Sequence, residues 1–180
     1  DLMMQGAEVD TFGVGERLIT SSSSPVFGGV YKLVAVENEG GEIVPKIKVS
    51  ENTAKITNPH FKKVYRYFDN ESGKALADEL CVYDEVVDSL NPHTIFDYNA
   101  TWKTKTLTNF TAKELLVPIF KNGERVYESP SIQEIAKYCK EQIDLLWDEV
   151  KRFENPHTYY VDLSKKLYEI KNILLNVYGV

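Results

Sequence analysis

The sequence predicts an α+β fold, with the end of an α/β barrel, then antiparallel β-hairpins, then a C-terminal helical pair. Three observations favour this order. A strand-like run ends in a glycine loop near the start, short apolar runs separated by turn residues fill the middle, and apolar residues recur at helical spacing from Ile132 onward. We expect three regions, at residues 1–36, 37–128 and 129–180. With 180 residues, of which 43% are hydrophobic, the chain can form one domain or two small lobes that share an interface.

The first region is predicted to begin with the end of a helix. Residues 1–5 followed by Gly6 are typical of a last helical turn that glycine ends in the left-handed conformation. Residues 8–12 then predict a short strand that leads into a glycine loop, Gly13–Gly15. This order suits one unit of a β/α barrel, in which phosphate sites favour the C-terminal ends of the last strands.

The loop formed by Gly13, Val14 and Gly15 is the strongest functional signal among the residues. Glycines let successive backbone N–H groups point inward together, and such a nest binds phosphate without side-chain charge. A tight bend without a ligand explains the same residues equally well. A Rossmann fingerprint is excluded because Leu18 stands where its last glycine or alanine belongs, and a P-loop is excluded because no Lys-Ser or Lys-Thr follows.

Turn residues between short apolar runs predict three antiparallel hairpins in the middle region. These pair residues 30–36 with 43–49, residues 64–68 with 75–83, and residues 115–120 with 125–127. The third hairpin turns at Asn122-Gly123, which suits a type I′ turn, and Pro118 places its strand at an edge because proline cannot donate to a ladder. Residues 85–102 lack a pattern and predict a long connection that is flexible or covered by a partner.

Helical periodicity is the clearest pattern in the last region. Apolar residues share one helix face over residues 132–153, with a capping-box pattern at the start and an Asn-Pro pair after the end. A second helix is expected at about residues 163–177. Such stripes normally contact a core, and Trp147 widens the first face enough to suit contact with another domain or subunit.

Composition excludes several classes of function. A net charge of −6 argues against nucleic acid or an anionic membrane as a partner, because both require a basic face. No apolar run is long enough to span a bilayer, and the start lacks a signal-peptide layout, which a truncated chain would have lost. A cytoplasmic protein is expected because the two cysteines suit a reducing compartment. Cys81 and Cys139 fall within apolar patterns and are expected to be reduced core residues.

The residues themselves assemble no catalytic or metal-binding constellation. The three histidines all follow an Asn-Pro pair, and their unequal separations and lack of neighbouring ligands favour turns over a metal site. Asp84, Glu85 and Asp88 are expected to form a solvated face. Neither cysteine adjoins a histidine, and no serine lies in a nucleophile elbow.

Several stretches resemble the C-terminal region of bacterial nicotinate phosphoribosyltransferases. They are FGVGERLIT, SPVFGGVYKLVAV, IKVSENTAKITNPHFKKVYRYFDNESGKALAD, ELLVPIFKNGERVYESPS and LLWDEVKRFENPHTYYVDLSKKL. Together they span nearly the whole chain but only the last part of the longer family protein. The resemblance implies a fragment of a type II phosphoribosyltransferase, with the end of its irregular α/β barrel and without the catalytic front part.

The resemblance also implies a reaction and its participants. In the family, nicotinate reacts with phosphoribosyl pyrophosphate to give nicotinate mononucleotide for NAD biosynthesis, and ATP hydrolysis drives the reaction forward. The parent enzyme would use ATP and Mg, whereas this part is expected to hold neither and to be inactive alone. The expected partners are nicotinate, phosphoribosyl pyrophosphate, the remainder of the barrel and a second copy in a homodimer.

Only the glycine loop carries family site residues into this chain. It is similar to the loop that receives the 5′-phosphate of the ribose, so Gly13, Val14 and Gly15 are expected as backbone donors. Glu16 replaces the threonine common at this place, and a carboxylate beside a phosphate is unfavourable unless it points away or pairs with Arg17. The residues that hold nicotinate, pyrophosphate and magnesium in the family, and its phosphorylated histidine, belong to the missing part.

Two further classes of function stay open. The chain could serve as a non-catalytic structural or dimer-contact module, in which the glycine loop is only a turn. It could also be a phosphate-binding regulatory domain, which rests on the same loop alone. Binding of ribose 5-phosphate or nicotinate mononucleotide to the chain would separate a phosphate-binding role from a structural one.

Overall fold

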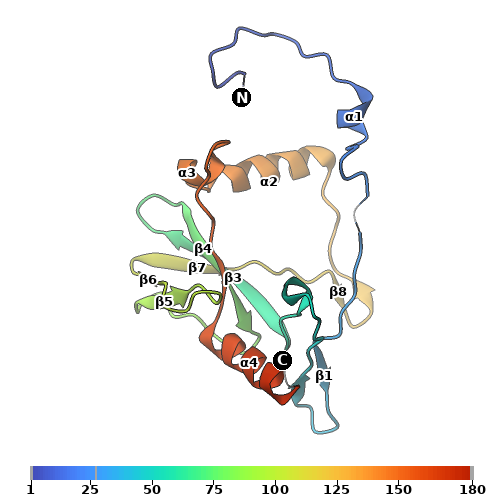
Figure 1. Ribbon diagram of the computed structural model, residues 1–180, viewed down its shortest axis with the longest axis vertical. Coiled ribbons are helices and arrows are strands. Elements are labelled where there is room, and N and C mark those ends of the chain that lie inside the picture. Colours follow the sequence, from blue (N-terminus) through green and yellow to red (C-terminus); the bar gives the residue numbers. More distant parts are fainter. Residues whose placement is uncertain (1, 27, 179–180) are drawn as a thin grey trace. The chain divides into compact units, whose positions relative to one another are not determined.

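The computed structural model describes residues 2–26 and 28–178. The chain divides into two compact units, Asp1–Lys32 and Leu33–Val180 (Figure 1). Most of the secondary structure, and every buried residue that is described, belongs to the second unit. Each unit is described by itself below.

The first unit begins with the predicted left-handed stop. Gly6 has a φ of +79°, its N–H donates to Met3 O at 3.1 Å, and the N–H of Ala7 donates to Leu2 O at 3.0 Å. This pair of bonds is the Schellman arrangement that ends helices, so the prediction at Gly6 is confirmed. The predicted strand at residues 8–12 is wrong, because these residues form no ladder and a strand requires a hydrogen-bonding neighbour. Within residues 2–26 and 28–32, the short helix α1 (Glu16–Ile19) is the one regular element.

The second unit opens with the first predicted hairpin, in a shorter form. Strand β1 (Ala35–Glu37) pairs antiparallel with β2 (Ile43–Pro45), and a single-turn 3₁₀ helix, η1 (Thr53–Lys55), follows. The Asn38 side chain accepts from the backbone N–H groups of Gly40 and Glu42 at 3.0 and 2.9 Å. This side-chain bonding closes the turn, as expected for asparagine at such a position.

A four-stranded sheet forms the centre of the second unit, in the order β10-β4-β3-β7. Its strands are β3 (Lys62–Asp69), β4 (Ala75–Val82), β7 (Phe110–Glu114) and β10 (Val161–Leu163). The β3–β4 hairpin confirms the second predicted hairpin. The sequence missed the other two strands: β7 pairs antiparallel with β3, and β10 arrives from far along the chain to pair parallel with β4.

A further hairpin corrects the predicted connection at residues 85–102. Strand β5 (His93–Phe96) pairs antiparallel with β6 (Thr104–Leu107). Ile95 and Leu107 join Tyr65, Tyr67 and Phe110 of the central sheet in one buried cluster. The hairpin therefore completes the core, and its strands escaped prediction because each is only four residues long.

The third predicted hairpin is confirmed at its turn. Strands β8 (Phe120–Lys121) and β9 (Glu124–Arg125) flank Asn122 and Gly123, whose φ angles of +52° and +80° are both positive, as a type I′ turn requires. The strands are much shorter than predicted, and Pro118 lies before them rather than within an edge strand.

Two long helices follow, and both begin where a serine caps them. Helix α2 (Ile132–Asp144) has the predicted capping box between Ser131 and Glu134, and α4 (Lys165–Val177) is capped by Ser164. The first helix does not reach residue 153 as predicted, because it ends at Asp144 with Leu145 as its C-cap, and a separate short helix, α3 (Asp148–Lys151), follows. The two helices are not packed as a pair, since they lie at different ends of the central sheet (Figure 1).

Burial distinguishes these two helices. Leu167 of α4 is fully buried with Val82 and Leu163, whereas α2 has no buried residue and its Ile132 and Ile135 are 80% and 53% exposed. Among the described residues, the first helical stripe therefore makes none of its expected buried core contacts. Cys139 of α2 is likewise exposed, which corrects its expected core position, whereas Cys81 is buried as predicted.

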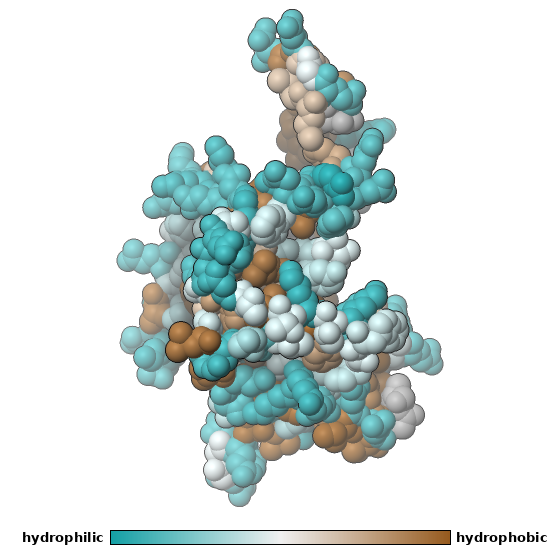
Figure 2. Space-filling model, turned by 90° about the vertical axis from the view of Figure 1, so that its left-hand side faces the viewer, coloured by the Kyte–Doolittle hydropathy of each residue, from teal (hydrophilic) through white to brown (hydrophobic). Residues whose placement is uncertain are grey.

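The surface of the second unit is mixed in character. Where Figure 2 views it, apolar side chains form scattered patches among hydrophilic ones. Among the described residues, no helix is both long enough and apolar enough to cross a membrane.

Candidate functional site

The predicted phosphate loop lies on the first unit, directly before α1. Gly13, Val14 and Gly15 are all exposed, and Gly15 caps the helix with φ −82° and ψ 169°. A Cβ at Gly13 or Gly15 would meet nothing within 4 Å, and neither residue has a left-handed φ. The loop thus presents open, extended backbone, and this conformation differs from a closed nest, in which backbone handedness alternates.

The two neighbours of the loop are exposed as well. Glu16 and Arg17 form the first turn of α1, and no ion pair joins them to each other or to another described residue. The expected pairing of Glu16 by Arg17 is therefore absent from this conformation.

The central sheet carries a different polar arrangement on each face, because neighbouring residues of a strand point to opposite sides. On one face, the guanidinium of Arg66 donates to both carboxylate oxygens of Asp78 at 2.8 Å. Gln142 of α2 and Tyr159 complete the group: Arg66 Nη1 donates to Gln142 Oε1 at 3.1 Å, and the Tyr159 hydroxyl donates to Asp78 Oδ1 at 2.8 Å. The hydrogen bond to Asp78 raises the pKa of Arg66 further above its ordinary value. This group joins the sheet to α2 and to the segment before β10.

The opposite face holds the Glu79 cluster, formed by Tyr67, Glu79 and His93. Glu79 is 2% exposed, accepts a short hydrogen bond from the Tyr67 hydroxyl, and lies 2.8 Å from His93 Nε2. Burial, followed by the charge of Glu79, raises the pKa of Tyr67 well above its ordinary value. The His93 side chain thus enters a buried network at the start of β5, which corrects its prediction as a turn histidine.

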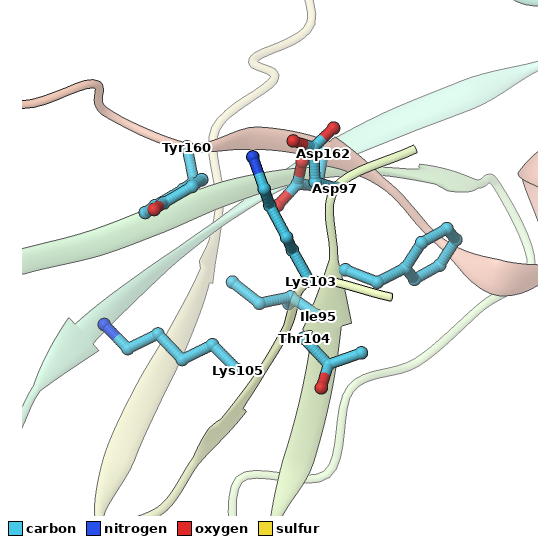
Figure 3. A pocket seen from close by; sticks show the side chains of 8 residues that line it. Ile95, Asp97, Lys103, Thr104, Lys105, Tyr160 and Asp162 are labelled. Carbon is cyan, nitrogen blue, oxygen red and sulfur yellow. The ribbon is translucent and has the colours of Figure 1, made fainter. Parts of the chain in front are cut away.

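Beside this cluster lies the Asp162 pocket, a cavity of about 70 Å³. Its lining residues are Ile95, Phe96, Asp97, Lys103, Thr104, Lys105, Tyr160 and Asp162. Figure 3 shows the carboxylates of Asp97 and Asp162 side by side, with the ammonium of Lys103 on the same side of the pocket. Burial, with the charges of Asp97 and Glu79, raises the pKa of Asp162 to about 6.

The acidic turn after β4 is also more structural than predicted. Glu85 Oε2 accepts from the Val82 N–H at 2.6 Å and from the Ser164 hydroxyl at 2.7 Å, so it links the end of β4 to the start of α4. Asp84 pairs with Lys166 of α4 at 2.7 Å. These two carboxylates therefore hold α4 in place and do not form a purely solvated face.

None of these groups makes an active site by itself. Burial and the nearby Glu79 raise the pKa of the Cys81 thiol, which keeps it from acting as a nucleophile. The described residues also contain no cluster of three or more histidine, cysteine, aspartate or glutamate side chains that could hold a metal ion. The arrangement can position and stabilise, but no nucleophile with a base is assembled in it.

Sequence reasoning missed the buried polar residues of the second unit. Glu79 had one usable signal, since it interrupts the otherwise largely apolar strand ALADELCV. Asp162 had none, because the strand that carries it is three residues long and pairs with a strand some eighty residues earlier.

Comparisons with known proteins agree with this architecture. Residues 61–171 match the family model described as nicotinate phosphoribosyltransferase C-terminal domain. The chain is 41% identical over 171 residues to a nicotinate phosphoribosyltransferase of Bacillus subtilis (strain 168), covering 95% of this chain and 35% of that protein. It is 33% identical over 172 residues to one of Caenorhabditis elegans, covering 94% and 30%. The chain thus spans about a third of the length of the curated relatives that it matches.

A solved structure shows the same fold. The crystal structure of human nicotinic acid phosphoribosyltransferase aligns with a TM-score of 0.57 and 22% identity, over 69% of this chain and 24% of that one. The α+β fold is shared with that structure, and the match of residues 61–171 to the family model places the chain in the class of phosphoribosyltransferase C-terminal domains. Specifically, the chain belongs to the nicotinate phosphoribosyltransferase C-terminal domain family.

Proposed function

We propose that the protein to which this chain belongs is a nicotinate phosphoribosyltransferase. It would join nicotinate to phosphoribosyl pyrophosphate, release pyrophosphate and form nicotinate mononucleotide for NAD biosynthesis, with ATP hydrolysis coupled to the reaction. The observation that carries this proposal is the family match over residues 61–171, together with the likeness to the Bacillus enzyme over nearly the whole chain.

Within that enzyme, we assign the Gly13–Gly15 loop to the 5′-phosphate of the ribose. The backbone N–H groups of Gly13, Val14 and Gly15 donate to no described residue, and no side chain covers the loop. They are therefore available to a phosphate, which would draw the extended loop around itself. Anchoring a phosphate that does not react converts remote binding energy into alignment of the sugar.

ATP, Mg²⁺ and the homodimer belong to the proposal for the whole protein. The stretches that resemble the family do not include its magnesium-binding and phosphorylated residues, so we expect ATP and Mg²⁺ to be held by residues outside this chain. A cytoplasmic location fits the absence of a disulfide between Cys81 and Cys139, which are both free thiols.

A second candidate function is a structural or dimer-contact module. The observation that favours it is the face of α2, on which Ile132, Ile135, Tyr138 and Ile143 are between 49% and 80% exposed. A helix with an apolar stripe normally covers another surface. Such a contact is compatible with the enzymatic proposal, because one part of an enzyme can both complete a site and join subunits.

The glycine loop gives the direct test. In the enzyme that contains this chain, Gly15→Val should raise KM for phosphoribosyl pyrophosphate and lower kcat/KM by at least about tenfold, because closing the loop into a nest needs left-handed backbone that valine disfavours, and the hydrogen bonds to the charged phosphate are then lost. The matched control is Ser23→Val, an exposed residue of the same unit. Unchanged kinetics of Gly15→Val would refute the phosphate role, whereas a parent enzyme without nicotinate mononucleotide synthesis would refute the proposed function itself.

A further inference from the structure

A polar groove of about 620 Å³ lies beside α4 on the second unit, and we call it the Lys171 groove. Its lining comes from three stretches far apart in the chain: residues 53–58, which include η1, the turn at residues 98–99 after β5, and residues 168–175 of α4. The polar side chains that matter below are those of Asn58, Tyr98, Asn99, Tyr168, Lys171 and Asn172. The volume falls within the range of small-molecule sites, about 300–1,000 Å³.

Lys171 is a partly buried lysine whose charge has no carboxylate partner among the described residues. Its ammonium donates to Asn58 Oδ1 at 2.8 Å and lies 5.7 Å from the centre of the Tyr98 ring. By contrast, Lys166 of the same helix pairs with Asp84 at 2.7 Å. Burial lowers the pKa of Lys171, so the groove withdraws this charge from water. An ammonium group has three donors, and an acceptor among the described residues is present for one of them.

The rest of the lining is neutral and rich in hydrogen-bonding groups. Among the described residues it contains no acidic one, although the chain as a whole has a net charge of −6. The hydroxyls of Tyr98 and Tyr168 and the side-chain amides of Asn99 and Asn172 bond to no described residue. The Tyr168 ring is held edge-on to Phe96, with ring centres 5.4 Å apart. The groove therefore offers one positive charge and several fixed polar groups to the same occupant.

We propose that the Lys171 groove binds a small hydroxylated monocarboxylate, such as an acid derived from a sugar. The carboxylate accepts from Lys171, and the hydroxyl groups bond to the neutral amides and phenols of the lining, which are donors and acceptors as hydroxyls require. A single lysine favours a single negative charge. Leu175 lies in the last turn of α4, so the negative end of the helix dipole adjoins the groove and disfavours a phosphate dianion. This site goes beyond the proposed function and does not depend on it.

Binding of gluconate to the full chain provides the test. In the chain labelled with ¹⁵N, NMR follows the amide shifts at constant ionic strength as gluconate is added to about 20 mM, well above an expected Kd of about 1 mM or less. Saturable shifts centred on residues 53–58, 98–99 and 168–175 support the proposal. Sorbitol has the same length of carbon chain and no carboxylate, so it should bind at least about tenfold more weakly. Absence of saturation, equal binding of sorbitol, or tighter binding of inorganic phosphate overturns the proposal.

Variants of α4 separate recognition in the groove from a general effect of charge. Lys171→Met should weaken gluconate binding at least about tenfold, because a hydrogen bond to a charged group is lost. The matched control is Lys165→Met, which removes the same charge from a side chain that is 84% exposed and should leave Kd unchanged. Tyr168→Phe removes only a hydroxyl and keeps the ring against Phe96, so it should preserve the Tm and weaken binding about threefold. Equal losses from the two lysine variants, or full affinity in Tyr168→Phe, would overturn the proposal.

Discussion

At the scale of single residues, the alternation of side chains along β3 and β4 decides which face of the sheet each of four polar residues occupies. Arg66 and Asp78 point to the face of α2, and Tyr67 and Glu79 point to the face of the β5–β6 hairpin. Tyr67, Asp78 and Glu79 are buried, Arg66 is partly buried, and each pair is hydrogen-bonded, as buried polar groups must be. Asp162 is the exception among the buried carboxylates, and it is therefore the residue on which pH should act.

Breaking the Arg66–Asp78 pair should be strongly destabilising. Arg66→Met leaves Asp78 buried with only the Tyr159 hydroxyl as a partner, and removal of one member of a buried pair costs about 3 kcal/mol. Urea denaturation should show this loss in the free energy of unfolding. Lys137→Met, which removes an exposed pair with Glu141, should cost less than about 0.5 kcal/mol, and similar losses in the two variants would contradict the assignment.

Asp162→Asn should stabilise the protein at neutral pH and not at acid pH. The pKa of Asp162 is about 6 in the folded chain, against an ordinary value of about 3.9 for an unfolded one. The folded state therefore holds the proton longer, and stability falls as pH rises from about 4 to about 6. The variant should exceed the parent by about 1–2 kcal/mol above about pH 7, an amount reduced for partial solvation, and should match it near pH 4. A difference independent of pH would contradict the raised pKa.

At the scale of elements, two helices with similar apolar stripes have different surroundings. Leu167 anchors α4 against Val82 of the sheet, while α2 lies over a cavity of about 510 Å³ that Arg66 and Asp78 help to line. An apolar stripe indicates that a helix packs against another surface, but it does not indicate whether that surface belongs to the same chain. The sequence therefore located both helices and could not decide their burial.

Leu167→Ala should loosen α4 from the sheet. The side chain is fully buried, and deleting such a leucine costs about 2–5 kcal/mol through lost transfer energy and the cavity that remains. Thermal unfolding measures the loss, and hydrogen exchange should show α4 amides as the most affected. Ile173→Ala on the same helix is the control, because Ile173 is 61% exposed and should cost well under 1 kcal/mol. Equal effects of the two changes would show that α4 is not docked through Leu167.

The hairpins show which elements local sequence can specify. The turns at Asn38–Gly41, Asp69–Gly73 and Asn122–Gly123 were predictable because asparagine, aspartate and glycine favour turn conformations directly. Strands β5, β7 and β10 were not, since each has three to five residues and gains stability only from neighbours that the fold supplies.

At the scale of the whole molecule, the two units differ in how much surface they bury, and therefore in whether each can fold alone. All described residues of the first unit except Ala7 are exposed, whereas both buried clusters lie in the second. A unit without buried apolar surface cannot compensate the entropy of folding. The glycine loop is therefore expected to gain its order from other parts of the enzyme or from a bound phosphate.

Removal of residues 1–32 should leave the second unit folded. The shortened chain should unfold cooperatively, with a Tm within about 2 °C of that of the full chain, because the core stays intact. Circular dichroism measures the transition, and limited proteolysis of the full chain should cut within residues 7–32 first. A large fall in Tm, or first cleavage within the central sheet, would show that the units depend on each other.

By itself, the sequence determined the α+β class, the family, the turns and the starts of the two long helices. Each of these follows from the chemistry of residues close together in the chain, or from stretches of sequence that resemble the family. Only the tertiary structure decided which residues lie next to each other in space. It pairs β10 in parallel with β4, buries α4 but not α2, and brings Asp97, Glu79 and Asp162 together. The reason is physical, since the pairing of distant strands and the burial of charge depend on contacts between residues far apart in the chain, which local patterns do not encode.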